Sequence, residues 1–223
     1  TLVCDCPRQA IDGIGKQLKQ IEALTGDHLP PPDPANPQLN SAWGQLLGYE
    51  GSGSAYYFGV FEKLLKQELG FRKRVRRPPT DPVNAMLSLG YVLLANQVAS
   101  AVNVTGLDPY VGFLHGAKYG KPALALDLME EFRPLVVDSV VLSLVNTKAI
   151  KAKDFTETLG AYRLTDGGRK VFYQKFEERL NTTIQHPTFD YKVTYRKAIE
   201  VQTRLLGKWL VGEVEQYIPF VVR

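Results

Sequence analysis

The sequence predicts an all-α protein, because helical periodicity recurs along the chain and the alternation typical of strands is nearly absent. Only a few residues around 162–164 alternate as a strand would. Of the 223 residues, 44% are hydrophobic and 22% charged, which excludes disorder, collagen and coiled coil as descriptions of the whole chain. We expect one helical domain over 41–223, preceded by a helix and a Pro-rich linker within 1–40.

The first expected helix covers residues 7–24, where an apolar stripe recurs at steps of three and four. Its members are Ile11, Ile14, Leu18, Ile21 and Leu24. Five prolines within 26–40 exclude regular structure there, so this segment is a linker or an ordered loop. Residues 41–70 are helical in period, but three glycines between 48 and 53 interrupt them. We therefore expect two helices, with Glu50 near their junction.

A third helical segment begins at Asp81, the expected N-cap, with Pro82 in the first turn, and runs to about Asn103. On this mostly apolar helix, Asn84 is as consistent with a bond to backbone near the cap as with a functional role.

The next helical pattern starts at Ala123 and lasts about twenty residues, with Pro134 requiring a kink or break near Phe132. Residues 165–168 are typical of a turn. Two further amphipathic helices are expected, over 169–181 and 193–218.

Cysteine content and hydropathy indicate the compartment. Cys4 and Cys6 are too close in sequence to staple the fold, which favours a reducing cytoplasm. The longest apolar run, 135–145, falls short of the roughly 18 residues that cross a bilayer, so no membrane contact is expected. The first residue is Thr1, and we expect the chain to be a piece of a longer protein.

Three carboxylates mark the helix that starts at Ala123. Asp127, Glu130 and Glu131 stand at i, i+3 and i+4, so all three can lie on one helical face. A hard divalent cation would offset their repulsion. A solvated acidic face is the alternative, but apolar neighbours indicate a largely buried helix, in which carboxylates need partners.

Two further residues fit a hard metal site. His115 lies in a Gly-rich loop twelve residues before Asp127, and Glu50 has glycines on both sides that let the backbone approach a ligand. One histidine with several carboxylates suits Mg²⁺ or Mn²⁺ better than structural zinc. Alternatively, His115 is a hydrogen-bonded structural residue and Glu50 a partner of a helix dipole.

Basic residues concentrate between 72 and 77, where two prolines at 78 and 79 favour an exposed loop. The predicted DNA-binding residues are Arg72, Lys73, Arg74, Arg76 and Arg77, with Lys118 and Lys121. Such a cluster can hold phosphate backbones despite a net charge of only +4. The alternatives are a loop that only solubilises the chain, or a binding surface on the C-terminal helices.

Six ordered strings across about 45–223 resemble the catalytic half of the CRISPR-associated spacer-acquisition integrases. They are GYEGSGSAYYF (48–58), DPVNAMLSLGYVLL (81–94), GLDPYVGFLHG (106–116), ALALDLMEEFRPLVVD (123–138), RLTDGGRKVF (163–172) and the ending GEVEQYIPFVVR. The order of all six makes the resemblance more specific than any single string.

The resemblance implies a metal-dependent endonuclease and integrase that transfers a DNA 3′-hydroxyl onto a target phosphodiester. A Glu, a His and a further acidic residue bind Mg²⁺ or Mn²⁺ in this family, and here they fall on Glu50, His115 and Glu130. Asp127, one helical turn earlier, competes with Glu130 for the place of the third ligand. DNA, a small ferredoxin-like adaptation partner, a homodimer and a prokaryotic cytoplasm are implied as well.

Two departures from the family pattern stand out. The family's N-terminal β-rich domain, which contributes to its dimer, has no counterpart in this chain. The loop before the acidic helix often carries Gly-Arg, a small residue and Ser, whereas 120–123 read Gly-Lys-Pro-Ala. Lysine keeps the charge but loses the two-pronged geometry of arginine. A transposon-encoded integrase and a non-catalytic helical DNA-binding or scaffold fragment are the alternative functions.

Overall fold

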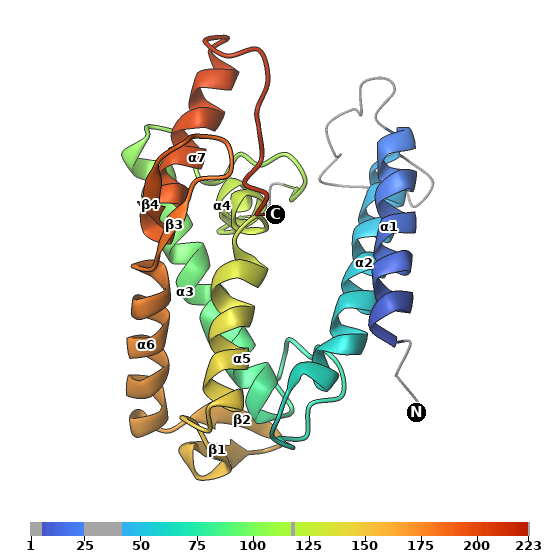
Figure 1. Cartoon of the computed structure of the whole chain (residues 1–223), viewed down its shortest axis with the longest axis vertical. Coiled ribbons are helices and arrows are strands. Elements are labelled where there is room, and N and C mark those ends of the chain that lie inside the picture. The colour runs from blue at the N-terminus through green and yellow to red at the C-terminus, as the bar shows by residue number, and fades with distance from the viewer. Residues whose placement is uncertain (1–5, 25–41, 117–118, 223) are drawn as a thin grey trace. The chain divides into compact units, whose positions relative to one another are not determined.

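The computed structural model describes residues 6–24, 42–116 and 119–222, which belong to two compact units (Figure 1). Unit 1 comprises Thr1–Arg74 and unit 2 comprises Val75–Arg223. The division therefore falls inside the basic segment 72–77, whereas the sequence analysis placed a boundary at residue 40. The expected Pro-rich linker, 26–40, and Lys118 lie outside the described residues.

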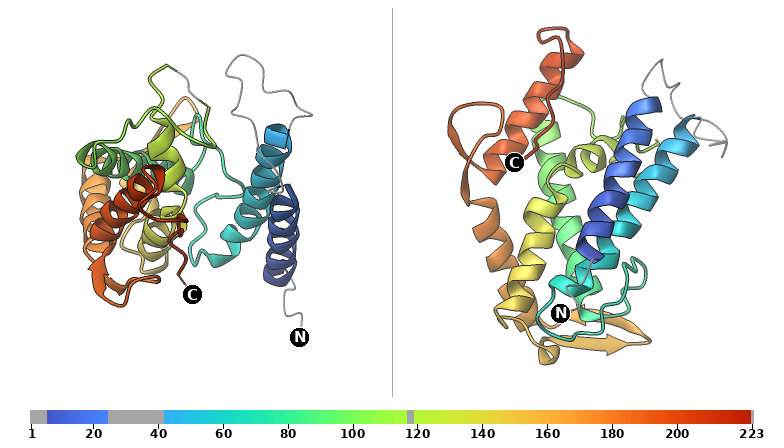
Figure 2. Two further views of the ribbon diagram at one scale, coloured as in Figure 1. Left: turned by 90° about the horizontal axis from the view of Figure 1, so that it is seen from above. Right: turned by 45° about the vertical axis from the view of Figure 1, so that its right-hand side comes forward.

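Unit 1 contains a pair of antiparallel helices, α1 (Cys6–Leu24) and α2 (Ala42–Leu64), which lie side by side (Figure 2). The first helix is confirmed, but the expected break near Glu50 is wrong, because α2 continues through all three glycines. A helical glycine costs about 1 kcal/mol relative to alanine without forbidding the helix. Packing of α2 against α1 offsets that cost. The two helices approach so closely that a Cβ added at Gly13 of α1 would lie 2.8 Å from the ring of Tyr56 on α2.

Unit 2 is built around α3 (Pro82–Val104). Its expected start is confirmed, since Asp81 Oδ1 accepts the Asn84 backbone N–H at 2.8 Å and Pro82 occupies the first turn. The Asn84 side chain is structural: its Nδ2 donates to Asp81, and its Oδ1 accepts the Val75 N–H at 2.9 Å. This exchange of hydrogen bonds attaches the incoming chain to the start of α3.

By length and hydropathy alone, α3 is the one helix in the described part of the chain that could cross a membrane, which the sequence analysis did not anticipate. The apolar side chains of α3 are explained by burial, because other elements pack on this helix, among them α4 (Ala123–Met129), α5 (Ser139–Asn146), α7 (Tyr195–Leu210) and strand β2 (Ala161–Leu164). Val83, Met86, Leu87, Leu94, Val98 and Val102 are fully buried. We therefore describe α3 as the core helix of unit 2.

The break required by Pro134 is confirmed. Helix α4 (Ala123–Met129) ends before it, a π-helical turn follows at Pro134–Asp138, and α5 (Ser139–Asn146) continues. Here α3 approaches so closely that a Cβ at Gly90 would overlap Val137 and lie 3.2 Å from Phe172. The absence of a side chain at Gly90 therefore lets the π-helical turn pack directly against α3.

The expected all-α class is only partly right, because the structure is mostly helical but also contains two small antiparallel hairpins. One pairs β1 (Phe155–Thr158) with β2 (Ala161–Leu164), and the other pairs β3 (Thr183–Gln185) with β4 (Lys192–Thr194). Strands of three or four residues are too short to produce a recognisable alternation. Their partners stabilise them, as when Tyr162 N–H extends the first hairpin by donating to Pro79 O.

The last helices are α6 (Asp166–Leu180) and α7 (Tyr195–Leu210). The turn expected at 165–168 is wrong, because Thr165 caps α6 by accepting the Gly168 N–H at 3.1 Å. Helix α7 ends well before residue 218, and 211–222 form a C-terminal segment that packs back on unit 2. Within this segment Phe220 is buried and stacks on Phe132 at 4.9 Å between ring centroids.

Replacing Gly90 with alanine should destabilise unit 2 by about 1–3 kcal/mol, because the added methyl group overpacks the contact with Val137 and Phe172. Urea unfolding followed by circular dichroism measures this change. Gly207→Ala is the matched control, since only Leu107 comes within 4.0 Å of its Cβ, and it should stabilise α7. Equal effects of the two substitutions would contradict this description of the core.

Candidate active site

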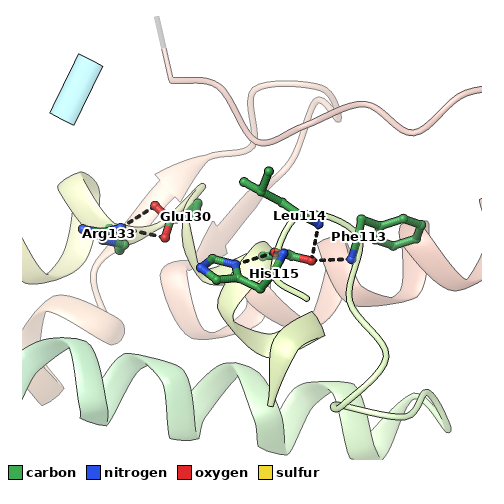
Figure 3. A network of polar contacts seen from close by, with 6 residues as sticks. Phe113, Leu114, His115, Glu130 and Arg133 are labelled. Atoms are coloured by element: carbon green, nitrogen blue, oxygen red, sulfur yellow. Dashed lines mark hydrogen bonds and ion pairs between the residues drawn. The ribbon is translucent and has the colours of Figure 1, made fainter. Parts of the chain in front are cut away.

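The Asp127 carboxylate on α4 organises the loop that carries His115 (Figure 3). Its Oδ2 accepts the backbone N–H groups of Phe113 at 2.6 Å and Leu114 at 3.0 Å. Its Oδ1 accepts the His115 N–H at 3.0 Å. Because the side chain is only 12% exposed, these charge-assisted bonds replace the water that the carboxylate loses on folding.

The same carboxylate orients the His115 ring, whose Nδ1 lies 2.6 Å from Asp127 Oδ1. An ionised carboxylate only accepts, so Nδ1 carries the proton and donates it. In neutral His115 the lone pair is then on Nε2, the nitrogen turned away from Asp127. Gly112 makes the arrangement possible, because a Cβ there would lie 2.7 Å from Asp127 Oδ2.

Glu130 follows Asp127 by one helical turn and is held by Arg133. One guanidinium nitrogen, Nη1, donates to both Glu130 carboxylate oxygens at 2.6 Å (Figure 3). The Glu130 side chain remains 36% exposed, so solvent and ligands can still reach it. The spacing i, i+3 places its carboxylate on the face of α4 that also carries Asp127.

Arg133 is itself held by a second layer of polar groups. Its guanidinium carbon lies 4.5 Å from the centre of the Tyr91 ring, and the Tyr91 hydroxyl donates to Asp138 Oδ1 at 2.6 Å. Burial and the Asp138 carboxylate raise the pKa of Tyr91, so the phenol stays protonated. Burial opposes the charge of Arg133, but Glu130 raises the pKa of its guanidinium, and the ion pair persists.

Glu131 has partners of its own and binds the C-terminal segment. It accepts hydrogen bonds from Tyr217 OH, from Gln202 Nε2 at 3.1 Å and from the Phe220 backbone N–H at 2.8 Å. Burial and Glu131 raise the pKa of Tyr217, which therefore remains a donor. The three carboxylates that the sequence places together thus have three different sets of partners.

A largely apolar pocket of about 230 Å³ adjoins this network. Asp127 and Glu131 contribute its polar wall, and the ring centroids of Phe113 and Trp209 lie 6.2 Å apart beside it. The remaining lining residues are Leu124, Leu128, Leu206 and Tyr217. The pocket is therefore continuous with the loop that carries His115.

The predicted ligands are thus brought together only in part. The structure joins His115 to Asp127 and places Glu130 one helical turn after Asp127, whereas Glu50 lies on α2 in unit 1. The approach of Glu130 to His115, and that of Glu50 to both, stays a prediction. Across the described ranges, no three His, Cys, Asp or Glu residues form a group that could hold a metal ion by themselves.

The predicted DNA-binding role of the basic residues also stays a prediction. Arg72 forms ion pairs with Glu62 and Glu68, the latter at 3.1 Å. Arg76 and Arg77 are exposed, as a phosphate contact would require, and Lys121 is half-buried.

Three members of the network were not predicted from the sequence as site residues: Tyr91, Arg133 and Asp138. The i, i+3 spacing of Glu130 and Arg133 was a usable signal, because oppositely charged residues at that spacing pair on a helix. Nothing local indicates the bond between Tyr91 and Asp138, which are 47 positions apart.

Residues 7–178 match the family model described as CRISPR associated protein Cas1. An endonuclease Cas1 of Thermus thermophilus is 49% identical over 178 residues, covering 80% of this chain and 54% of that protein. A Cas4 exonuclease/Cas1 endonuclease fusion of Geobacter sulfurreducens is 46% identical over 184 residues, covering 80% of this chain and 33% of the fusion. The chain thus spans about half of the first relative and a third of the second.

Two solved structures share the fold. A casposase bound to its integration product has a TM-score of 0.74 at 31% identity, covering 81% of this chain and 55% of the casposase chain. A Cas1 protein from Thermotoga maritima has a TM-score of 0.75 at 30% identity, covering 95% of this chain and 60% of that protein.

Asp127→Asn should release the loop at 113–115, because the amide retains one acceptor oxygen and its NH₂ group faces backbone donors. We expect amide hydrogen exchange at these residues to accelerate at least about tenfold, with a stability loss of about 1–3 kcal/mol. Glu178→Gln serves as the control and should change little, because it alters only exposed contacts on α6, an ion pair with Lys175 and a hydrogen bond from Gln174. Unchanged exchange in Asp127→Asn would contradict the anchoring role.

Proposed function

Because this chain belongs to the CRISPR-associated Cas1 family, we propose that it carries the catalytic part of a metal-dependent DNA endonuclease and integrase of spacer acquisition. The proposed reaction transfers a DNA 3′-hydroxyl onto a target phosphodiester. The observation that carries the proposal is the pairing of Asp127 with His115, which supports a metal-binding role for Nε2. Metal-binding histidines commonly have such a carboxylate behind the ring.

The donor set fits a hard divalent cation. His115 Nε2 and the Glu130 carboxylate would be ligands, and Glu50 would complete the set from α2. Two carboxylate ligands favour Mg²⁺ or Mn²⁺, and the single imidazole is compatible with both. Asp127 would act behind His115, since its oxygens already accept four hydrogen bonds.

The residues of this chain would divide the work as follows. Asp127 fixes the tautomer and orientation of His115, and Arg133 balances the charge of Glu130 before the cation arrives. When bound, the divalent cation would polarise the scissile phosphate and favour deprotonation of the attacking hydroxyl. The 3′-hydroxyl oxygen of one DNA end would bond to the target phosphorus, while the bond from that phosphorus to one strand oxygen of the target breaks. The DNA itself is the nucleophile, so no serine or tyrosine nucleophile is required.

The structural relative with a bound integration product supports strand joining in particular. It also supports a second candidate, in which the parent protein is a transposon-encoded integrase with the same chemistry. For the CRISPR protein, we propose a small ferredoxin-like partner and a homodimer of the full-length chain. The genomic neighbourhood of the coding sequence would separate the two candidates.

His115→Ala and Glu130→Gln should each abolish Mn²⁺-dependent DNA cleavage and joining while leaving the helical circular dichroism nearly intact, because each removes a ligand. Labelled oligonucleotide assays with Mn²⁺ and Mg²⁺ measure both reactions. Asp127→Asn should be milder, since Asp127 would not bind the cation directly. If it is more damaging than Glu130→Gln, Asp127 is the ligand and the assignment reverses.

Replacing Arg72, Lys73, Arg74, Arg76 and Arg77 with glutamine should weaken binding to unrelated duplexes to a similar degree, because phosphate contacts do not read bases. The slope of log affinity against log salt should become shallower by roughly 0.9 per lost contact. The matched control replaces five exposed cations elsewhere: Lys16, Lys19, Lys151, Lys153 and Lys170. If both variants change the slope equally, overall charge rather than this segment determines binding.

A further inference from the structure

We propose that Arg133 and Tyr91 are positioning residues that hold the Glu130 carboxylate ready for the divalent cation, with Asp138 as their anchor. This inference rests on the proposed function, in which Glu130 is a metal ligand. The three residues come from α3, from the junction after α4 and from the π-helical turn, so the arrangement exists only in the folded chain.

The contact between Arg133 and Glu130 fixes the ligand itself. Nη1 donates to both carboxylate oxygens at 2.6 Å, which defines where the carboxylate lies. A free glutamate side chain loses up to about 2 kcal/mol of rotamer entropy when it is ordered. Ordering it before the cation arrives removes that cost from metal binding.

The contact between Arg133 and Tyr91 fixes the guanidinium in turn. The ring lies 4.5 Å from the guanidinium carbon, within the range of a cation–π interaction. The Arg133 side chain is only 14% exposed, so it is far more constrained than an arginine on the surface. Its position therefore depends on the position of the Tyr91 ring.

Asp138 fixes the ring. The carboxylate is buried, at 3% exposure, and accepts the Tyr91 hydroxyl at 2.6 Å. The preceding residues of the two elements, Gly90 and Val137, are in the tight contact that only glycine allows. Backbone packing and the hydrogen bond thus act at adjacent positions, which sets the register between α3 and the π-helical turn.

A second pair with similar geometry shows what a structural role looks like. The guanidinium carbon of Arg179 lies 4.6 Å from the Tyr195 ring centre, and its Nε donates to the Leu135 backbone carbonyl at 2.7 Å. In that pair the arginine binds a backbone carbonyl, whereas Arg133 binds the partly exposed Glu130 carboxylate one helical turn after Asp127. Arg179 is therefore a matched control within the same unit.

The experiment is a Mn²⁺ titration of the 223-residue chain, with free Mn²⁺ measured by electron paramagnetic resonance. Arg133→Gln and Tyr91→Leu should weaken Mn²⁺ binding about 10- to 100-fold, as loss of an outer partner of a metal ligand typically does. Arg133→Lys should restore part of the affinity. Tyr91→Phe, which keeps the ring but loses the bond to Asp138, should have a smaller effect than Tyr91→Leu.

Arg179→Gln should lower the thermal midpoint yet leave the Mn²⁺ affinity unchanged, which separates positioning from general stability. Unchanged Mn²⁺ binding in folded Arg133→Gln would overturn the inference. Tighter binding would also overturn it, because the guanidinium would then only repel the cation. If Arg133→Gln does not fold, the comparison of the two Tyr91 variants decides. Failure of the unsubstituted chain to bind Mn²⁺ would instead overturn the proposed metal site, and this inference with it.

Discussion

The candidate site depends on one carboxylate, that of Asp127. An ionised side chain with so little exposure is stable only if donors replace its lost hydration, and three successive backbone N–H groups and one imidazole do so. The bonds make the loop at 113–115 follow α4, and they determine which nitrogen of His115 is available. The need of the buried Asp127 carboxylate for hydrogen-bond donors thus determines the conformation of the loop at 113–115 and the orientation of the His115 ring.

The neighbouring carboxylates meet the same requirement with different partners. Glu130 is paired with Arg133, and Glu131 with donors from α7 and the C-terminal segment. Asp127 binds its loop and Glu131 binds the C-terminal segment, whereas the Glu130 side chain is 36% exposed and remains accessible from solvent. A single acidic motif therefore supplies two carboxylates that fix the framework and a third that we propose as a metal ligand.

The break at Pro134 makes this division possible. A continuous helix would carry Arg133 and Asp138 onward in regular α-helical register. Instead, the π-helical turn sits against Gly90 of α3 and brings Asp138 to Tyr91. Because π-helical turns are uncommon and concentrate at functional sites, its position directly after Arg133, the partner of Glu130, supports a role in shaping the site.

The sequence by itself determined the features that local chemistry controls. Asp81 and Pro82 mark the start of α3, Pro134 marks the end of α4, and spacing identified His115 and the acidic residues as one region. Only tertiary structure decided the partners of Glu131, up to 89 residues away, and the bond between Tyr91 and Asp138. It also made α2 continuous, since packing against α1 outweighs the low helix propensity of glycine. The reason is physical: caps and prolines act through adjacent backbone, whereas buried charges find partners wherever the folded chain brings donors.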